Sequence, residues 1–166
     1  MENYNWKEFT KRITIRATAK SIYDAWTTQA GIESWFLRLA EFKTKDAVVR
    51  KRNESIQKGD KYKWLWFGYD NTAVEANEIL LANGKDELEF SFSGGCIVNV
   101  RMKSEDNETI CELTQSMPMD DEKDQRHFYI ECGKGWTFYL ANLKSILEGG
   151  IDLRNKNVNI QNVVNA

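Results

Sequence analysis

Alternating polar and apolar positions predict a β-sheet through most of the chain. The first predicted strand, in residues 8–18, has one apolar face, interrupted only by Lys11 and made of Phe9, Ile13, Ile15 and Ala17. From residue 59 onward, five further segments alternate in the same way: 60–67, 72–82, 86–92, 96–104 and 109–117. Short turns such as Asn83-Gly84 and Gly94-Gly95 separate some of them, which indicates an antiparallel meander.

The stretch between residues 37 and 58 is charged and mixed. We expect one strand around residues 47–50 and then a charged loop that ends at Gly59. The basic residues 50–52 have acidic neighbours, so they are expected to form a solvated edge.

Helical spacing appears twice. "SIYDAWTTQAGIESWF", residues 21–36, predicts two short helices separated near Gly31, with Ser21 as the first cap and Asp24 three residues on. From Asp124 to about Glu148, apolar residues recur in steps of three and four, which predicts one long amphipathic helix. Gly149-Gly150 is expected to end it.

Composition limits the function classes. The chain has 166 residues, 23 basic against 25 acidic side chains and a net charge of −2, so nothing in its charge favours nucleic acid or an anionic membrane. The sequence has no apolar run of the roughly 18 residues that a membrane span needs. The first residues also lack a signal-peptide core, so we expect a cytoplasmic protein.

Metal and disulfide chemistry find little support in the sequence. There is one histidine, His127, and the three cysteines have no metal-ligand spacing: Cys96, Cys111 and Cys132. We therefore expect reduced thiols and neither a cofactor nor a metal.

Aromatic residues are abundant, with 6 Trp, 8 Phe and 6 Tyr. Each can bury roughly 150–250 Å². They either fill a dense core or form the wall of an apolar cavity, and the sequence leaves both readings open.

The order of the elements and several short sequence motifs resemble those of one family. The motifs are residues 21–28 and 31–36, "GDKYKW" at 59–64, "ETICELTQS" at 108–116, and the Gly135-Trp136 pair followed by Leu140, Leu143 and Leu147. In that order, over about residues 8–154, they resemble the START-like (SRPBCC, helix-grip) superfamily, and within it the family named after the activator of heat-shock-protein-90 ATPase. Gln115 departs from the family, which often has histidine there.

The resemblance implies an α+β helix-grip fold. A curved antiparallel sheet of about six or seven strands would wrap around the long C-terminal helix, with the two short helices supporting one end of that helix. We expect a single domain over residues 1–154, followed by a frayed or loosely docked tail, 155–166.

In this fold, a space between the sheet and the long helix could bind a small hydrophobic or aromatic molecule. The predicted ligand-binding residues are the large inward side chains of the strands and helices: Trp35, Phe36, Tyr62, Trp64, Trp66, Phe90, Phe92, Val100, Met102, Gln115, Trp136 and Leu140. Each could instead be ordinary core. Gln115 needs a hydrogen-bond partner on that inward face, either a ligand, a water or another side chain.

The charged strand residues Glu75, Arg101 and Glu112 are expected on the outer, solvated face of the sheet. His127 is expected at the surface near the start of the long helix, and the acidic residues 119–124 around its N-terminus.

Three functions remain open. The first is a binding module for a small hydrophobic molecule. The second, implied by the resemblance alone, is a co-chaperone-like domain that acts on a heat-shock-protein-90 type ATPase. The third, a cavity enzyme such as a cyclase or hydrolase, is disfavoured because the inward faces carry almost no ionisable group beyond Tyr62 and the thiols.

Overall fold

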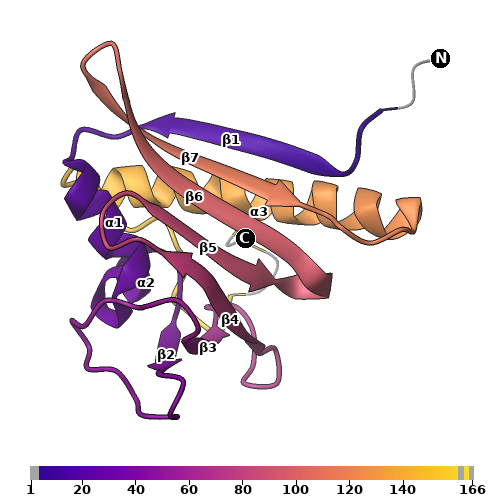
Figure 1. The fold of residues 1–166 in the computed structure, drawn as a ribbon, viewed down its shortest axis with the longest axis horizontal. Helices are drawn as coiled ribbons and strands as arrows, with labels where there is room; N and C mark the ends of the chain where they lie inside the picture. Colours follow the sequence, from indigo (N-terminus) through magenta and orange to yellow (C-terminus); the bar gives the residue numbers. More distant parts are fainter. Residues whose placement is uncertain (1–3, 161–162, 165–166) are drawn as a thin grey trace.

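One antiparallel sheet wraps around a long helix. This computed structural model describes residues 4–160, 163 and 164. Within them, seven strands pair in the order β1-β7-β6-β5-β4-β3-β2, and α3 runs along one face of the sheet (Figure 1). The strands are β1 Glu8–Thr14, β2 Leu39–Lys43, β3 Lys61–Leu65, β4 Glu75–Ala82, β5 Glu87–Phe92, β6 Cys96–Glu105 and β7 Glu108–Ser116. The helices are α1 Ala19–Thr27, α2 Gln29–Trp35, the short 3-10 helix η1 Ser93–Gly95, and α3 Glu122–Leu147. The predicted α+β helix-grip fold is confirmed.

The break between α1 and α2 is made by one threonine and one glycine. Thr28 Oγ1 donates to the Asp24 carbonyl of α1 (3.0 Å) and accepts from the Gly31 amide of α2 (2.9 Å). A Cβ on Gly31 would lie 2.3 Å from the Asp24 carbonyl oxygen. A glycine is therefore needed where the two helices approach each other so closely.

Two local predictions in this region were wrong. Thr18, not Ser21, caps α1, because Thr18 Oγ1 accepts the Ser21 amide at 3.0 Å. Asp24 forms no capping box and pairs with Lys20 at 2.6 Å instead.

The strand expected around residues 47–50 was also wrong. That stretch makes only one isolated bridge, between Lys43 and Val49. Ala47 has a positive φ of 61°, and Val48 and Val49 are exposed. The strand is β2, whose alternate residues Ala40 and Phe42 are buried beside β3.

One charged side chain of this loop is buried, although a solvated edge was predicted there. Arg50, predicted at a solvated edge, is 8% exposed and forms a hydrogen-bonded ion pair with Asp60, which is 1% exposed. Since buried charges need partners, this pair holds the loop against the start of β3.

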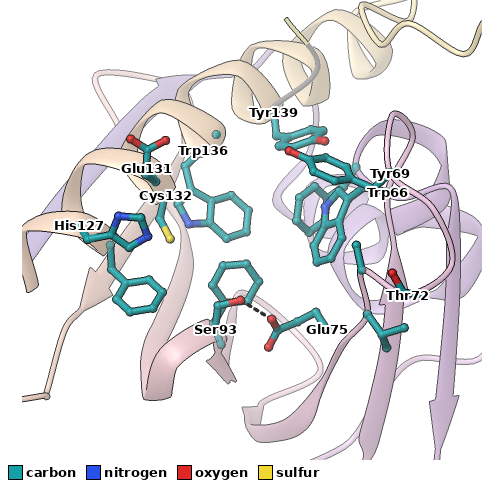
Figure 2. Close-up of a pocket in the computed structure, with 16 residues that line it drawn as sticks. Trp66, Tyr69, Thr72, Glu75, Ser93, His127, Glu131, Cys132, Trp136 and Tyr139 are labelled. Atoms are coloured by element: carbon teal, nitrogen blue, oxygen red, sulfur yellow. Dashed lines mark hydrogen bonds between the residues drawn. The ribbon is translucent and has the colours of Figure 1, made fainter. Parts of the chain in front are cut away.

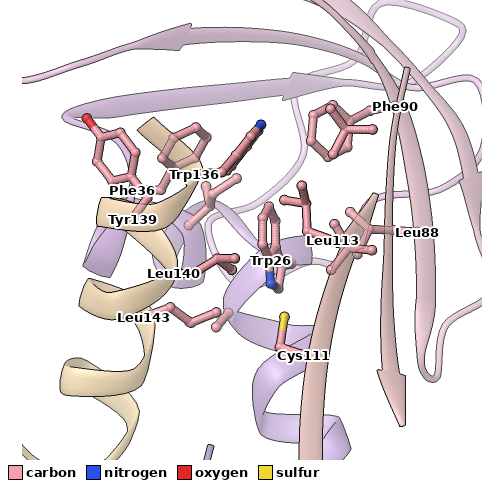
Figure 3. Close-up of a cluster of buried hydrophobic side chains, with 14 of the residues drawn as sticks. Trp26, Phe36, Leu88, Phe90, Cys111, Leu113, Trp136, Tyr139, Leu140 and Leu143 are labelled. Atoms are coloured by element: carbon pink, nitrogen blue, oxygen red, sulfur yellow. The ribbon is translucent and has the colours of Figure 1, made fainter. Parts of the chain in front are cut away.

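The core lies between α3 and the inner face of the sheet (Figure 3). Trp26 lies at its centre, with ring centroids 4.6 Å from Trp35 and 5.8 Å from Trp136. Asn142 Nδ2 donates to the Trp35 carbonyl at 2.6 Å. This contact joins α3 to the end of α2, as expected if the short helices support one end of the long one.

The segment after α3 is docked by Arg154, which is 6% exposed. The guanidinium donates to the carbonyls of Leu37 (3.0 Å), Glu33 (3.1 Å) and Ser34 (2.8 Å). Within the predicted tail 155–166, residues 161–162 and 165–166 lie outside the described residues. Of the described helices, none is long and apolar enough to cross a membrane.

Candidate functional site

A cleft of about 460 Å³ lies between α3 and the β3–β4 side of the sheet (Figure 2). Successive turns of α3, from His127 to Tyr139, form one wall of the cleft. The opposite wall comes from the loop 66–74 that follows β3, and the base from Glu75, Phe92 and Ser93. The cleft opens to solvent at its rim, where Tyr69 is 55% exposed.

Aromatic rings form most of the inner wall. Phe36 contacts rings from both sides of the cleft. The centroid of its ring lies 5.1 Å from that of Trp136, 4.7 Å from that of Tyr139 and 5.8 Å from that of Trp66. Phe92 extends the wall on the sheet side, 5.5 Å from Trp136. These edge-on and tilted contacts fix each ring through its neighbours, so the wall is preformed.

The turn at η1 brings the sheet close to α3. Gly94 has a φ of 68°, and a Cβ there would lie 2.1 Å from the Phe128 ring. Only glycine meets both demands, the left-handed backbone and the close packing. The turn therefore holds Ser93 directly beneath the helix.

The predicted ligand-binding residues divide into two groups. Phe36, Trp66, Phe92 and Trp136 line the cleft. The others lie in the core around it, each at most 7% exposed: Trp35, Tyr62, Trp64, Phe90, Val100, Met102, Gln115 and Leu140. These side chains pack against one another, as in the stacked pair Tyr62–Trp64, whose centroids are 3.9 Å apart, and their part in ligand binding stays a prediction.

Gln115 finds its partner in another side chain. Its Oε1 accepts the indole N–H of Trp136 at 2.7 Å, and the amide is fully buried. The amide therefore fixes the orientation of Trp136, whose ring faces the cleft.

Glu75 corrects another prediction. It was expected on the outer face, yet it is 8% exposed and lines the cleft. Its cross-strand partner is Trp64, which points inward, so Glu75 must point inward too. Its carboxylate accepts hydrogen bonds from Ser93 Oγ and Asn77 Nδ2. Arg101 and Glu112, by contrast, do lie on the outer side of the sheet. Arg101 forms an ion pair with Glu87, and Glu112 forms ion pairs with Arg12 and Lys103.

Comparison with known proteins decides the family. The family described as "Activator of Hsp90 ATPase homolog 1-like protein" matches residues 16–148. The chain belongs to this family. No curated protein matches the sequence.

Solved structures share the fold at low identity. A Staphylococcus saprophyticus protein is 15% identical, with a TM-score of 0.68, over 89% of this chain and 96% of its own. The Aha1 dimer from Colwellia psychrerythraea is 20% identical, with a TM-score of 0.64, over 86% and 97%. CalU16 from Micromonospora echinospora is 18% identical, with a TM-score of 0.60, over 88% and 77%. At these identities the likeness supports the fold alone.

In this member of the Hsp90-ATPase-activator family, sequence reasoning missed part of the cleft. Cys132 and Tyr139 share a helix face with Trp136, at steps of four and three, so helical spacing could have identified them. Tyr69 and Thr72 lie in a loop, where no periodicity marks an inward side. His127 is exposed near the start of α3, as predicted, but it also lines the cleft.

The Cys132 thiol of the cleft is poorly suited to nucleophilic catalysis. Burial raises the pKa of the Cys132 thiol, and the charges of Glu75 and Glu131 raise it further. Since the thiolate is the reactive form, this cysteine is a weak nucleophile near neutral pH. The described residues contain no group of three side chains that could hold a metal ion.

Proposed function

We propose that this protein binds a small, largely apolar molecule in the cleft between α3 and the sheet. The cleft itself carries the proposal. Its volume of about 460 Å³ falls within the roughly 300–1,000 Å³ typical of small-molecule sites. Its wall of large rings with a few polar groups at the base also matches such sites.

The cleft contains two tryptophans, Trp66 and Trp136, which report on occupancy. A panel of aromatic and aliphatic probes would be titrated while tryptophan fluorescence and the unfolding temperature are followed. A bound probe quenches or shifts the emission, and it raises the unfolding temperature because it binds only the folded state. If no probe in a broad panel changes either signal, the proposal fails.

Gly135 offers a matched pair of control variants. It lines the cleft, and a Cβ there meets nothing within 4 Å. Gly135→Phe should fill the cleft and abolish probe binding, while Gly135→Ala should bind as the parent does. Both replacements remove a helix glycine, so a difference in binding between them comes from cleft volume.

A second candidate is action on an Hsp90-type ATPase. The family match over residues 16–148 supports it. The test is the ATPase rate of the host's Hsp90 with and without the purified protein, and the absence of both binding and stimulation would remove this candidate. The Gly135→Phe variant separates the two functions, because an interaction through the outer surface does not need an open cleft.

A further inference from the structure

The base of the cleft holds a buried carboxylate without a cation. Glu75 is 8% exposed, and its two oxygens accept hydrogen bonds from the neutral groups Ser93 Oγ and Asn77 Nδ2. In the described part of the chain, no lysine, arginine or histidine forms an ion pair with it. A buried charge with only neutral partners is costly, and a cation placed beside it would lower that cost.

The rest of the cleft also lacks positive charge. Among the described residues, no lysine or arginine lines it. Glu131, the other carboxylate of the lining, is mostly exposed and already paired with Lys134 at 2.7 Å. His127 lies at the outer end, on the first turns of α3. The negative charge that lacks a partner is therefore concentrated at Glu75, and it also raises the pKa of Cys132 and Tyr62.

The aromatic wall suits the same kind of guest. The faces of tryptophan, tyrosine and phenylalanine rings attract cations within about 6 Å of the ring centroid. Trp136, Phe92 and Trp66 line the cleft together with Glu75, so rings and carboxylate surround one space (Figure 2).

We propose that the cleft selects ligands that carry an amine or quaternary ammonium group on an apolar body, with the cationic group beside Glu75. This inference rests on the proposed binding function and narrows it to a ligand class. It excludes carboxylates such as fatty acids as preferred ligands, because their charge would meet that of Glu75.

Three probes with one phenylbutyl body and different head groups test the inference: phenylbutylammonium, phenylbutanol and phenylpentanoate. Their dissociation constants would be measured by tryptophan fluorescence and calorimetry at moderate salt. The ammonium should bind about tenfold tighter than the alcohol, and the carboxylate most weakly.

If the alcohol or carboxylate binds as tightly as the ammonium, the charge preference is refuted while the binding function stands. If none of the three binds but other apolar probes do, the amine class is also refuted. If no probe of any kind binds, the binding function itself fails.

Glu75→Gln isolates the responsible group. Glutamine keeps the size and can still hydrogen-bond Ser93, so the alcohol should bind as before and the preference for ammonium should disappear. Glu89→Gln is the matched control, because Glu89 lies outside the cleft lining, on a neighbouring strand, and loses the same unit of charge. The Glu89→Gln protein should keep the preference for the ammonium probe. Retained ammonium preference in a folded Glu75→Gln protein, with folding checked by its unfolding transition, would overturn the assignment. If Glu75→Gln does not fold, Glu75→Asp should weaken ammonium binding selectively, and an unchanged preference would again overturn it.

Discussion

At the scale of single residues, Gln115 shows how one amide can organise an aromatic wall. Its Oε1 holds the Trp136 indole, while its Nε2 lies 3.8 Å from the Met117 sulfur. The site is fully buried, so no water can replace either bond without rearrangement. The orientation of Trp136 in the cleft therefore depends on this amide.

Gln115→Leu should lower the free energy of unfolding by about 1–3 kcal/mol, because it leaves the Trp136 N–H buried without an acceptor. Urea denaturation measures the loss. Thr114→Val is the control, since Thr114 bonds the neighbouring Thr10 hydroxyl at 2.9 Å at the surface, and it should cost about 1 kcal/mol or less. Equal losses in the two variants would show that the Trp136 bond contributes nothing special.

The three thiols make a second prediction at this scale. Burial raises the pKa of Cys96 to about 11 and that of Cys111 to about 12, and both side chains are fully buried. Cys132 is only partly buried and faces the cleft. In native protein at mildly alkaline pH, iodoacetamide should therefore label Cys132 first, and a bound cleft ligand should slow the labelling. Peptide mass spectrometry over time measures this, and labelling of Cys96 or Cys111 at the same rate would contradict it.

Glu75 also shows a limit of sequence reasoning. The alternation of β4 was not enough to assign the face of this glutamate, because polar residues surround it and the register shifts between Ile79 and Leu81. Its inward position follows from pairing with Trp64, a partner far away in the sequence. A buried polar residue of this kind becomes visible only when the cross-strand register is known.

At the scale of elements, the predictable parts are those with strong periodicity. Leu88, Phe90 and Phe92 of β5 are all buried, as their alternation indicates, and α3 begins within two residues of the predicted start. β2 escaped prediction because it has only five residues and none of them is β-branched, whereas residues 47–50 include two valines but have no pairing partner beyond one bridge. Tertiary pairing overrides such local preference.

The break between the two short helices gives an element-scale prediction. Gly31→Ala places a methyl group 2.3 Å from the Asp24 carbonyl and 2.8 Å from Thr28 Oγ1. The helices must then separate, so the variant should lose about 1–3 kcal/mol of stability, the usual range for overpacking. Thermal or urea unfolding measures it.

Gly133→Ala is the matched control, because a Cβ at Gly133 meets nothing within 4 Å and the helix α3 gains a better helix former. That variant should be neutral or more stable by up to about 1 kcal/mol. A stable Gly31→Ala protein would show that the α1–α2 junction tolerates more space than its geometry indicates.

At the scale of the whole molecule, the segment after α3 is bound against the end of α2 by the hydrogen bonds of Arg154. Asp152 accepts hydrogen bonds from Arg154 and pairs with Lys156 at 2.8 Å. Burial alone would raise the pKa of Asp152, but the hydrogen bonds from Arg154 and Lys156 outweigh it and hold that pKa well below its usual value. The carboxylate therefore favours the folded state when it is ionised.

This shift has a defined pH signature. Because the folded pKa is depressed, the stabilisation is fully present above the unfolded value of about 3.9 and is lost as the pH falls toward the folded pKa. Asp152→Asn should destabilise the protein at neutral pH and have progressively less effect below about pH 4. Unfolding free energies of both proteins across this pH range measure it, and a difference that does not change with pH would contradict the assignment.

The same segment bears on where the domain ends. We propose that residues 1–154 form the domain and that the remainder contributes little to its stability, because Arg154 is the last of the described residues whose side chain is buried. A chain that stops after Arg154 should lose at most about 1 kcal/mol of stability, since the Lys156–Asp152 pair is largely exposed.

A chain that stops after Gly150 removes more contacts. The carbonyls of Leu37 and Ser34 lose their donor Arg154, and the Asn142 side chain loses the Leu153 amide. This chain should lose about 2–5 kcal/mol. Urea denaturation of the two truncated chains beside the full chain measures both losses. A loss of about 2–5 kcal/mol already in the chain that stops after Arg154 would place the end of the domain beyond residue 154, and a loss of at most about 1 kcal/mol in both would place it at or before residue 150.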